Sequence, residues 1–434
     1  MSVWEKRTLN LLFLVALVWG ACVVGRATLS VNRSTDLGVY LAAAQAVRDH
    51  ADLYAATYNA DHYQYPPLLA LLLAHIVPAP PQPGLPVSAA FAITSGVWYL
   101  LSLFALGAAV RKLAGTLMRV WPTKNPSPSA IWQPVWTLRL LPIFVSLHSL
   151  GRELQLGQVD LFTLAFVCFV IAAAAEGQSW RAGLWLAAAG CLKVTPLLLL
   201  VHPIWRRDWR WLLSCFGGLI LGLVVIPVLA FGYDGAARYT REYVNVLVLP
   251  GLTGKATDHS RDAEMFNQNA VHNYSVLGVL HNLQHLSVAR NDRPPTASKS
   301  TRQLAEGIGI LLILLTLLAS RARREVARPA TVFCLSMLML LVVIAGPVCQ
   351  SYSFVLLIPV IMAVIAADLY RTGSVFPSPR VIGLLVAYVA AQAAASFSPL
   401  LRDSGLVLAT ILALWLMALL ALIQAAKSPP AKPA

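Results

Sequence analysis

Four aspartates gather in a short polar stretch that follows the first apolar segment of this chain. Residues 34–67 read STDLGVYLAAAQAVRDHADLYAATYNADHYQYPP, with no lysine and with Asp36, Asp49, Asp52 and Asp61. Asp36 lies at the predicted start of a short helix that Ser34 or Thr35 could cap. A carboxylate so close to lipid is costly unless it is paired or lies in a polar cavity, so it usually marks a functional site. The alternative is that Asp36 only complements the positive end of the helix.

The same stretch is rich in aromatic residues, in the segments ADLYAATY and YQYPP. Tyrosines at a membrane boundary are usually interfacial anchors, and that interpretation is favoured for Tyr54, Tyr58 and Tyr63 taken singly. Taken together they could line a sugar pocket, because aromatic faces stack on sugar C–H surfaces. We therefore include four residues of the stretch among the candidate substrate contacts: Tyr40, Asp52, Tyr54 and Tyr65.

Two further segments place polar residues in or beside apolar helices. LQLGQVDL puts Gly157, Gln158 and Asp160 at the mouth of a helix, and AAAGCLKVTPLLLL puts Lys193 in the middle of one, before Pro196. A lysine within a span is expected to face a polar cavity, pair with a carboxylate or extend to the interface. The alternative is a structural contact with backbone carbonyls that Pro196 leaves without partners.

A long segment in the second half, residues 232–302, contains MFNQNAVHNYSVLGVLHNLQH. Long loops without repeats are often lids or binding elements. His272, His281 and His285 have no cysteine or carboxylate at metal-ligand spacing, which makes metal binding a minority interpretation. A phosphate or hydroxyl contact is the more plausible role for His272.

The composition indicates a polytopic helical membrane protein. The 434 residues are 58% hydrophobic and only 12% charged, and their mean hydropathy is +0.68. Apolar runs long enough for helices recur along the chain, whereas the alternation of a membrane β-barrel is absent. The net charge of +14 lies mostly in short turns, as membrane topology requires, so nucleic-acid binding is a poor interpretation. The six cysteines are scattered singly and predict neither disulfides nor a metal site.

About twelve spans are predicted, with the N-terminus inside. They lie near residues 9–29, 67–79, 87–110, 135–150, 158–175, 182–202, 211–231, 304–320, 330–345, 353–367, 381–397 and 405–424. This count places 30–66 and 232–302 on the outer face. It also places the basic segment 111–130 there, against the positive-inside rule, unless 67–79 or 135–150 is re-entrant. We treat 1–424 as one domain and 425–434 as a cytoplasmic tail.

Several of these segments, taken in order, resemble glycosyltransferase family 87. They are DLGVYLAAAQAV, DLY, YQYPPLLALLLAHIVP, GQVDLFTL, AGLWLAAAGCLKVTPLLLLVHPIWRRDWR and NQN, and the resemblance runs to about residue 365. It implies the C-type membrane glycosyltransferase fold, all-α with short first-loop helices on the outer face of a bacterial inner membrane. The loop GPVCQSYSF, residues 346–354, departs from the family pattern and retains only Pro347 of its usual residues, which leaves the acceptor and the sugar open.

The resemblance also implies an activity. It is transfer of a sugar, with mannose expected, from a polyprenyl-phosphate donor to a hydroxyl of a lipid or glycan acceptor, with Asp36 as the catalytic base. One base acting across the ring from the leaving group gives inversion, and a positioned base contributes roughly 10²- to 10⁴-fold.

The leaving phosphate needs cations, for which Lys193, His272 and Arg261 are candidates. Gln158, Asn267 and Gln268 complete the predicted site, with the prenyl chain in an apolar groove and neither a cofactor nor a divalent metal required. The main alternative is a transporter or flippase of lipid-linked sugars, and a third is a structural subunit of a cell-envelope assembly.

Overall fold

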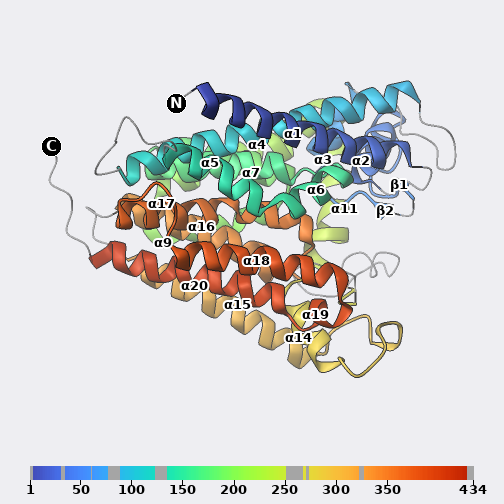
Figure 1. The fold of residues 1–434 in the computed structure, drawn as a ribbon. Coiled ribbons are helices and arrows are strands. Elements are labelled where there is room, and N and C mark those ends of the chain that lie inside the picture. Colours follow the sequence, from blue (N-terminus) through green and yellow to red (C-terminus); the bar gives the residue numbers. More distant parts are fainter. Residues whose placement is uncertain are drawn as a thin grey trace.

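The computed structural model describes residues 3–30, 35–59, 61–76, 88–122, 134–250, 267–269, 273–321 and 327–427. In this part of the chain the protein is a bundle of helices that run side by side, with a small extramembrane layer at one end (Figure 1). That layer holds a two-stranded antiparallel ribbon in which Tyr58 lies opposite Asp61. The prediction of an all-α fold is therefore confirmed apart from this short ribbon.

The first half of the chain forms the helices around the predicted first loop. Its elements are α1 (Val3–Leu29), α2 (Asp36–Arg48), β1 (Thr57–Tyr58), β2 (Asp61–His62), α3 (Pro67–Ala74), α4 (Ala89–Val120), α5 (Pro134–Val145), α6 (Leu147–Leu156), α7 (Asp160–Ala175), α8 (Ser179–Leu192), the 3₁₀ helix η1 (Thr195–Leu200), α9 (Val201–Arg206) and α10 (Trp209–Ile220).

The second half completes the bundle. It comprises the π-helix η2 (Leu221–Val225), α11 (Ile226–Tyr243), the π-helix η3 (Val244–Val248), α14 (Val276–Gln284), the 3₁₀ helix η5 (Arg290–Asp292), α15 (Lys299–Ala319), α16 (Ala327–Ala345), the 3₁₀ helix η7 (Ser351–Leu357), α17 (Ile358–Thr372), α18 (Pro379–Phe397), α19 (Pro399–Asp403) and α20 (Leu406–Lys427).

Apolar side chains both fill the centre of the bundle and cover its outside. In the apolar segment of α16, 72% of the residues are buried, and in that of η7 with α17 the share is 83%. In the apolar segment of α15, only 22% of the residues are buried. Peripheral helices carry large apolar side chains toward the surroundings, among them Phe104 and Leu229. Such a surface suits lipid, where the backbone polar groups must be satisfied within helices. The protein is therefore an integral membrane protein.

Seven described helical segments are long and apolar enough to cross a membrane, and three shorter apolar helices accompany them. The predicted count of twelve is not reproduced. The clearest difference is at 67–79, where α3 ends at Ala74 and its eight residues extend only about 12 Å. The predicted span 135–150 is divided between α5 and α6, which begins at Leu147. The helix predicted at 182–202 is likewise interrupted, at Lys193.

The short α3 bears on the basic segment 111–130, because the count that placed this segment on the outer face treated 67–79 as a span. Lys112 Nζ lies 3.2 Å from a carboxylate oxygen of Glu176, and Arg119 contacts the same oxygen. Glu176 follows the last turn of α7, about 24 Å along that helix from Asp160. Asp208, in the second basic turn, accepts a hydrogen bond from Ser179 at 2.5 Å. These basic residues therefore lie together, at the end of the bundle opposite to Asp160.

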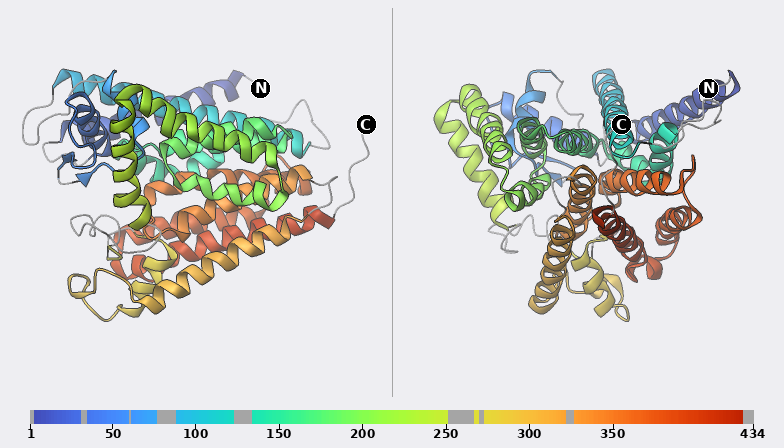
Figure 2. Two further views of the ribbon diagram at one scale, coloured as in Figure 1. Left: turned by 180° about the vertical axis from the view of Figure 1, so that it is seen from behind. Right: turned by 90° about the vertical axis from the view of Figure 1, so that its left-hand side faces the viewer.

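The predicted outer loop 232–302 is helical at its start, contrary to expectation. The helix that begins at Trp209 bends at Gly232, whose φ of 72° lies in the left-handed region that favours glycine, and continues to Val248. After the bend α11 runs across the ends of the other helices (Figure 2). There the Tyr239 hydroxyl donates to the Ala51 carbonyl at 2.8 Å, so α11 helps to close the extramembrane layer.

Candidate active site

Asp36 occupies the first turn of α2, as the sequence predicted. The Thr35 hydroxyl accepts a hydrogen bond from the Gly38 amide at 3.3 Å and caps the helix, while Ser34 lies outside the described residues. The side-chain amide of Gln158 donates to Asp36 Oδ2. Asp36 is only partly exposed, so its carboxylate sits in a restricted polar environment and not free at the surface.

Gln158 organises the surroundings of Asp36. The hydroxyls of Tyr40 and Tyr65 donate to Gln158 Oε1 at 3.0 and 2.8 Å. With its carbonyl oxygen occupied in this way, the amide must present its N–H groups to Asp36. Gly157 allows the close approach of α6 to α2, because a Cβ there would lie 2.9 Å from that of Leu37 and its φ is 69°. The structure thus brings together four predicted site residues from three segments.

A second polar group lies at the start of α7. Lys193 Nζ contacts Asp160 Oδ1 at 2.6 Å, and Ser353 Oγ donates to Asp160 Oδ2 at 3.0 Å. Asp160 is fully buried, whereas the Lys193 side chain is 19% exposed. Lys193 does not lie in the middle of a helix as predicted: it ends α8 with extended φ and ψ, before η1. Of the alternatives, pairing with a carboxylate is the one observed.

Glu153, a buried carboxyl group beside both clusters, was not among the residues predicted from the sequence. Its Oε1 accepts a hydrogen bond from the Leu161 amide at 3.2 Å, and its backbone oxygen accepts from the Gly157 and Gln158 amides. Burial and the neighbouring Asp160 raise the pKa of Glu153 well above its ordinary value. Glu153 therefore fixes the turn that carries Gln158. A glutamate four residues before a glycine that ends a helix was the available signal.

The same environment changes the acidity of Asp36. Burial raises the pKa of Asp36 to about 7, and the carboxylates of Asp61 and Asp160 act in the same direction, while Lys193 and the Gln158 hydrogen bond oppose them. A carboxyl group with a pKa near 7 is substantially ionised at neutral pH yet is a stronger proton acceptor than an ordinary aspartate. These are the properties required of a general base.

Asp61→Asn is expected to move the acid limb of the pH–rate profile to lower pH. The base role expected of Asp36 from the sequence requires a deprotonated carboxylate, so the rate of the expected sugar transfer should rise as pH increases through the pKa of Asp36. Removal of the negative charge at Asp61 makes ionisation of Asp36 easier and lowers that pKa. The measurement is the pH dependence of kcat/KM for sugar transfer. Asp49→Asn is the matched control, since Asp49 is exposed and contacts Gln45. An acid limb that moves to higher pH, or one that moves by the same amount in Asp49→Asn, would contradict the assignment of this limb to Asp36.

The predicted aromatic residues are buried and are not surface anchors. Tyr40, Tyr54 and Tyr63 are at most 2% exposed, and Tyr58 is 4% exposed. The Tyr54 hydroxyl donates to the Tyr65 carbonyl at 3.1 Å, and the rings of Tyr40 and Tyr65 meet edge to face at 5.1 Å. These contacts brace the tyrosines that hold Gln158. The cluster thus forms the wall behind Asp36.

Two other parts of the predicted site have structural contacts of their own. Asp52 is exposed and its Oδ1 accepts the Tyr54 and Ala55 amides at 2.9 and 3.2 Å, which fixes a turn. Asn267 Oδ1 accepts the Asn269 amide at 2.9 Å, and Gln268 Oε1 accepts from Asn273 at 3.2 Å. In the described structure none of these side chains contacts Asp36. Arg261 and His272 lie outside the described residues.

The loop 346–354, which departs from the family pattern, connects the segment around Asn273 with the Asp160–Lys193 pair. Asn273 Oδ1 accepts the Cys349 amide at 3.0 Å, and Cys349 O accepts the Tyr274 amide at 2.7 Å. A few residues later, Ser353 reaches Asp160, and the Tyr352 ring centroid lies 5.8 Å from Lys193 Nζ. The segment around Asn273 is therefore coupled to the Asp160–Lys193 pair through residues 349–353.

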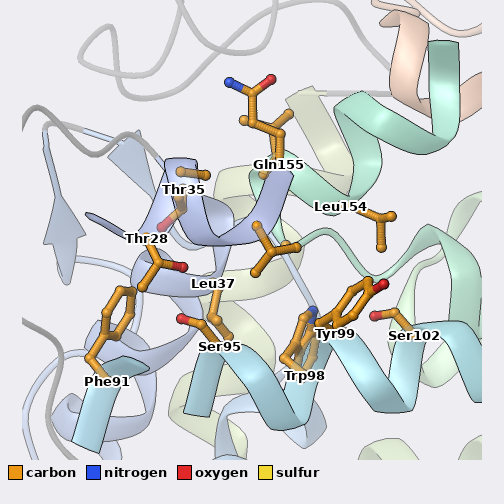
Figure 3. A pocket seen from close by; sticks show the side chains of 14 residues that line it. Thr28, Thr35, Leu37, Phe91, Ser95, Trp98, Tyr99, Ser102, Leu154 and Gln155 are labelled. Atoms are coloured by element: carbon orange, nitrogen blue, oxygen red, sulfur yellow. The ribbon is translucent and has the colours of Figure 1, made fainter. Parts of the chain in front are cut away.

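A crevice lies directly behind the segment that carries Asp36 (Figure 3). It is formed by α1, α2, α4 and the end of α6, with Thr35, Leu37 and Gly157 in its wall. Most of the lining is apolar, and none of it is charged. Ser95 Oγ and Trp98 Nε1 are buried there without a hydrogen-bond partner in the described part of the chain. The Trp98 ring also packs on Tyr40, with centroids 5.9 Å apart, and so connects the crevice to the site.

The fold and this group of residues define an integral membrane protein with a polar site at one end of its bundle. The model of glycosyltransferase family 87 matches residues 63–347, which is most of the chain. The chain therefore belongs to glycosyltransferase family 87.

Two curated relatives are similar to part of the chain. Both are described as polyprenol-phosphate-mannose-dependent alpha-(1-2)-phosphatidylinositol mannoside mannosyltransferases. The protein of Mycolicibacterium smegmatis is 26% identical, and the match covers 48% of this chain and 46% of that protein. The protein of Mycobacterium tuberculosis is 30% identical, and the match covers 39% of this chain and 37% of that protein. The similarity thus spans less than half of each relative.

Among solved structures, the chain is similar to ArnT from Cupriavidus metallidurans bound to undecaprenyl phosphate. The similarity covers 97% of this chain and 78% of that one, with 16% sequence identity and a TM-score of 0.44. This similarity is too weak to assign a shared fold.

Proposed function

We propose that the protein transfers a sugar, with mannose expected, from a polyprenyl-phosphate donor to a hydroxyl group of a lipid or glycan acceptor. The observation that carries the proposal is the position of Asp36. In a chain of glycosyltransferase family 87, this carboxylate is held by Gln158 beside the Asp160–Lys193 pair, with a pKa of about 7. The donor class is suggested by the names of the two curated relatives.

In the proposed reaction the acceptor hydroxyl gives its proton to Asp36 as its oxygen attacks the anomeric carbon. The bond from that carbon to the phosphate oxygen breaks, and polyprenyl phosphate leaves with the electron pair. A phosphomonoester is a good leaving group, so stabilisation of its charge matters more than its protonation. Lys193 is the proposed cation for this phosphate, because its charge already acts on the Asp36 carboxylate and it therefore lies near the reacting groups. Attack from the face opposite the phosphate inverts the configuration at the anomeric carbon. This chemistry needs neither a cofactor nor a divalent metal, and we propose that none is used.

We further propose that the Asp36 end of the bundle faces the outside of a bacterial inner membrane, with the C-type glycosyltransferase arrangement. Cytoplasmic turns carry an excess of lysine and arginine. Lys112, Arg119 and the turn 205–210 lie at the opposite end. The positive-inside rule applies to short loops, and the segment 232–302 is longer than these. Its arginines therefore do not count against this orientation.

The crevice behind Asp36 is the proposed route for the prenyl chain. Its lining is uncharged, so it suits the hydrocarbon part of the donor, whereas the phosphate belongs near Lys193.

Ala27→Phe, which fills the crevice, is expected to raise KM for a long-chain donor severalfold and to leave kcat less affected. The matched control is Ala92→Phe on the exposed face of α4. Transfer kinetics with long- and short-chain donors provide the measurement. Equal effects of the two substitutions, or equal effects on both donors, would exclude the crevice as the chain-binding route.

The proposed function is tested with purified protein in liposomes, polyprenyl-phosphate mannose and a bacterial lipid extract. Formation of a mannosylated product with release of polyprenyl phosphate is expected. Movement of intact donor between leaflets without any product would instead support the alternative of a flippase.

A further inference from the structure

Three arginines converge on a single carboxylate at the junction of α14, η5 and α19. Arg290 Nη2 lies 2.7 Å from Asp403 Oδ1, and Arg293 Nη1 lies 2.7 Å from Asp403 Oδ2. Arg402 Nε lies 3.6 Å from Asp403 Oδ1. All three guanidinium groups are largely buried, with 20%, 6% and 13% of their side chains exposed. Asp292, in the same turn, is exposed and makes no ion pair within the described residues. The cluster therefore carries an excess of two positive charges.

Several donors of this cluster remain without a partner. Arg293 is satisfied, because it also donates to the Val288 carbonyl and to Asn282 Oδ1 at 3.0 and 3.1 Å. In contrast, Arg290 Nε and Nη1 and Arg402 Nε are buried and have no hydrogen-bond partner in the described structure. Buried guanidinium N–H groups are expensive to leave unpaired. The acceptor that suits two adjacent guanidinium groups is a phosphate, which takes several charge-assisted hydrogen bonds at once.

The place of the cluster in the fold indicates where such a phosphate would come from. α19 lies between the end of α18 and the start of α20, two of the helices long enough to cross a membrane. It is at the same end of the molecule as α2 and the β1–β2 ribbon (Figure 1). Next to the arginines, Phe397 and Leu400 are 89% and 64% exposed. Basic residues beside exposed apolar side chains at the end of a span suit a lipid headgroup with its chains alongside.

We propose that Arg290 and Arg402 form a binding site for the phosphate of an anionic membrane lipid, held in place by the Arg293–Asp403 pair. This site is separate from Asp36 and does not depend on the proposed transfer activity. Its occupant is a phosphodiester lipid that lies against Phe397 and Leu400, and free phosphate, which offers the same kind of anionic oxygen acceptors, is the competing source.

The test uses a double variant that spares the structural pair. Arg290→Gln with Arg402→Gln removes the two excess charges and leaves Arg293 paired with Asp403. The control, Arg371→Gln with Arg380→Gln, removes equal charge; Arg371 pairs with Asp368 near the end of α17, and Arg380 is exposed. Native mass spectrometry measures retention of dioleoyl phosphatidylglycerol, and thermal unfolding with inorganic phosphate measures binding of the free anion.

The wild-type protein and the control are expected to retain phosphatidylglycerol, while the affinity of the double variant falls at least about tenfold. Equal retention by all three proteins would overturn the proposal, as would equal loss in the control. Stabilisation by phosphate without retained lipid would overturn the lipid as the occupant.

Discussion

Asp36→Asn is expected to reduce sugar transfer by at least about 100-fold, because the amide keeps the shape of the side chain but cannot accept the acceptor's proton. Folding should be preserved, since the side-chain oxygen of the introduced asparagine can still accept the hydrogen bond that Gln158 now gives to Asp36. The carboxylate is also costly to bury, as its raised pKa indicates, so a neutral amide should not destabilise the helix start. The measurement is the turnover of a polyprenyl-phosphate sugar by equal amounts of folded protein.

Asp49→Asn provides the control for this substitution, at an exposed aspartate that ends the same helix. It should leave transfer within about twofold of wild type, in keeping with the small effect of most exposed substitutions. Retention of more than about a tenth of wild-type turnover by Asp36→Asn would remove Asp36 as an essential base. Loss of folded protein would instead show that the Gln158 contact needs a carboxylate.

The sequence predicts those parts of the site whose cause is local. The cap at Thr35 and the start of α7 at Asp160 follow from short patterns of residue type, and both are found. The membrane class follows from composition, and seven long apolar segments agree with it. In contrast, the short α3 follows an apolar run of the same kind as a span, so periodicity and hydropathy alone do not distinguish the two.

Other features depend on contacts between distant segments and were not predictable from one sequence. Gln158 is 118 residues from Tyr40 and 93 from Tyr65, yet these hydroxyls decide how its amide is oriented. Glu153 was overlooked because its importance comes from burial beside Asp160, which only the packed α6 and α7 create. The break at Lys193 was missed for a related reason. Pro196 signalled an interruption nearby, but the pairing with Asp160 33 residues away determines where the lysine points.

Lys193→Met is expected to abolish transfer and also to destabilise the protein, by on the order of 3 kcal/mol, because it leaves Asp160 charged and fully buried without its cation. The double variant Lys193→Met with Asp160→Asn removes both charges, and Ser353 can still donate to the side-chain oxygen of the asparagine introduced there. We expect this double variant to recover most of the thermal stability, measured in detergent at equal lipid content. It should not recover transfer, because the site would still lack the cation that stabilises the charge of the leaving phosphate.

The comparison of the single and double variants separates two roles of Lys193 that a single substitution would confuse. A buried carboxylate needs its cation in order to fold, whereas the leaving phosphate needs a cation only during the reaction. Recovery of both stability and transfer would show that the Asp160–Lys193 pair is purely structural and that another cation holds the phosphate. Recovery of stability without recovery of transfer would support a contact between Lys193 and the donor phosphate.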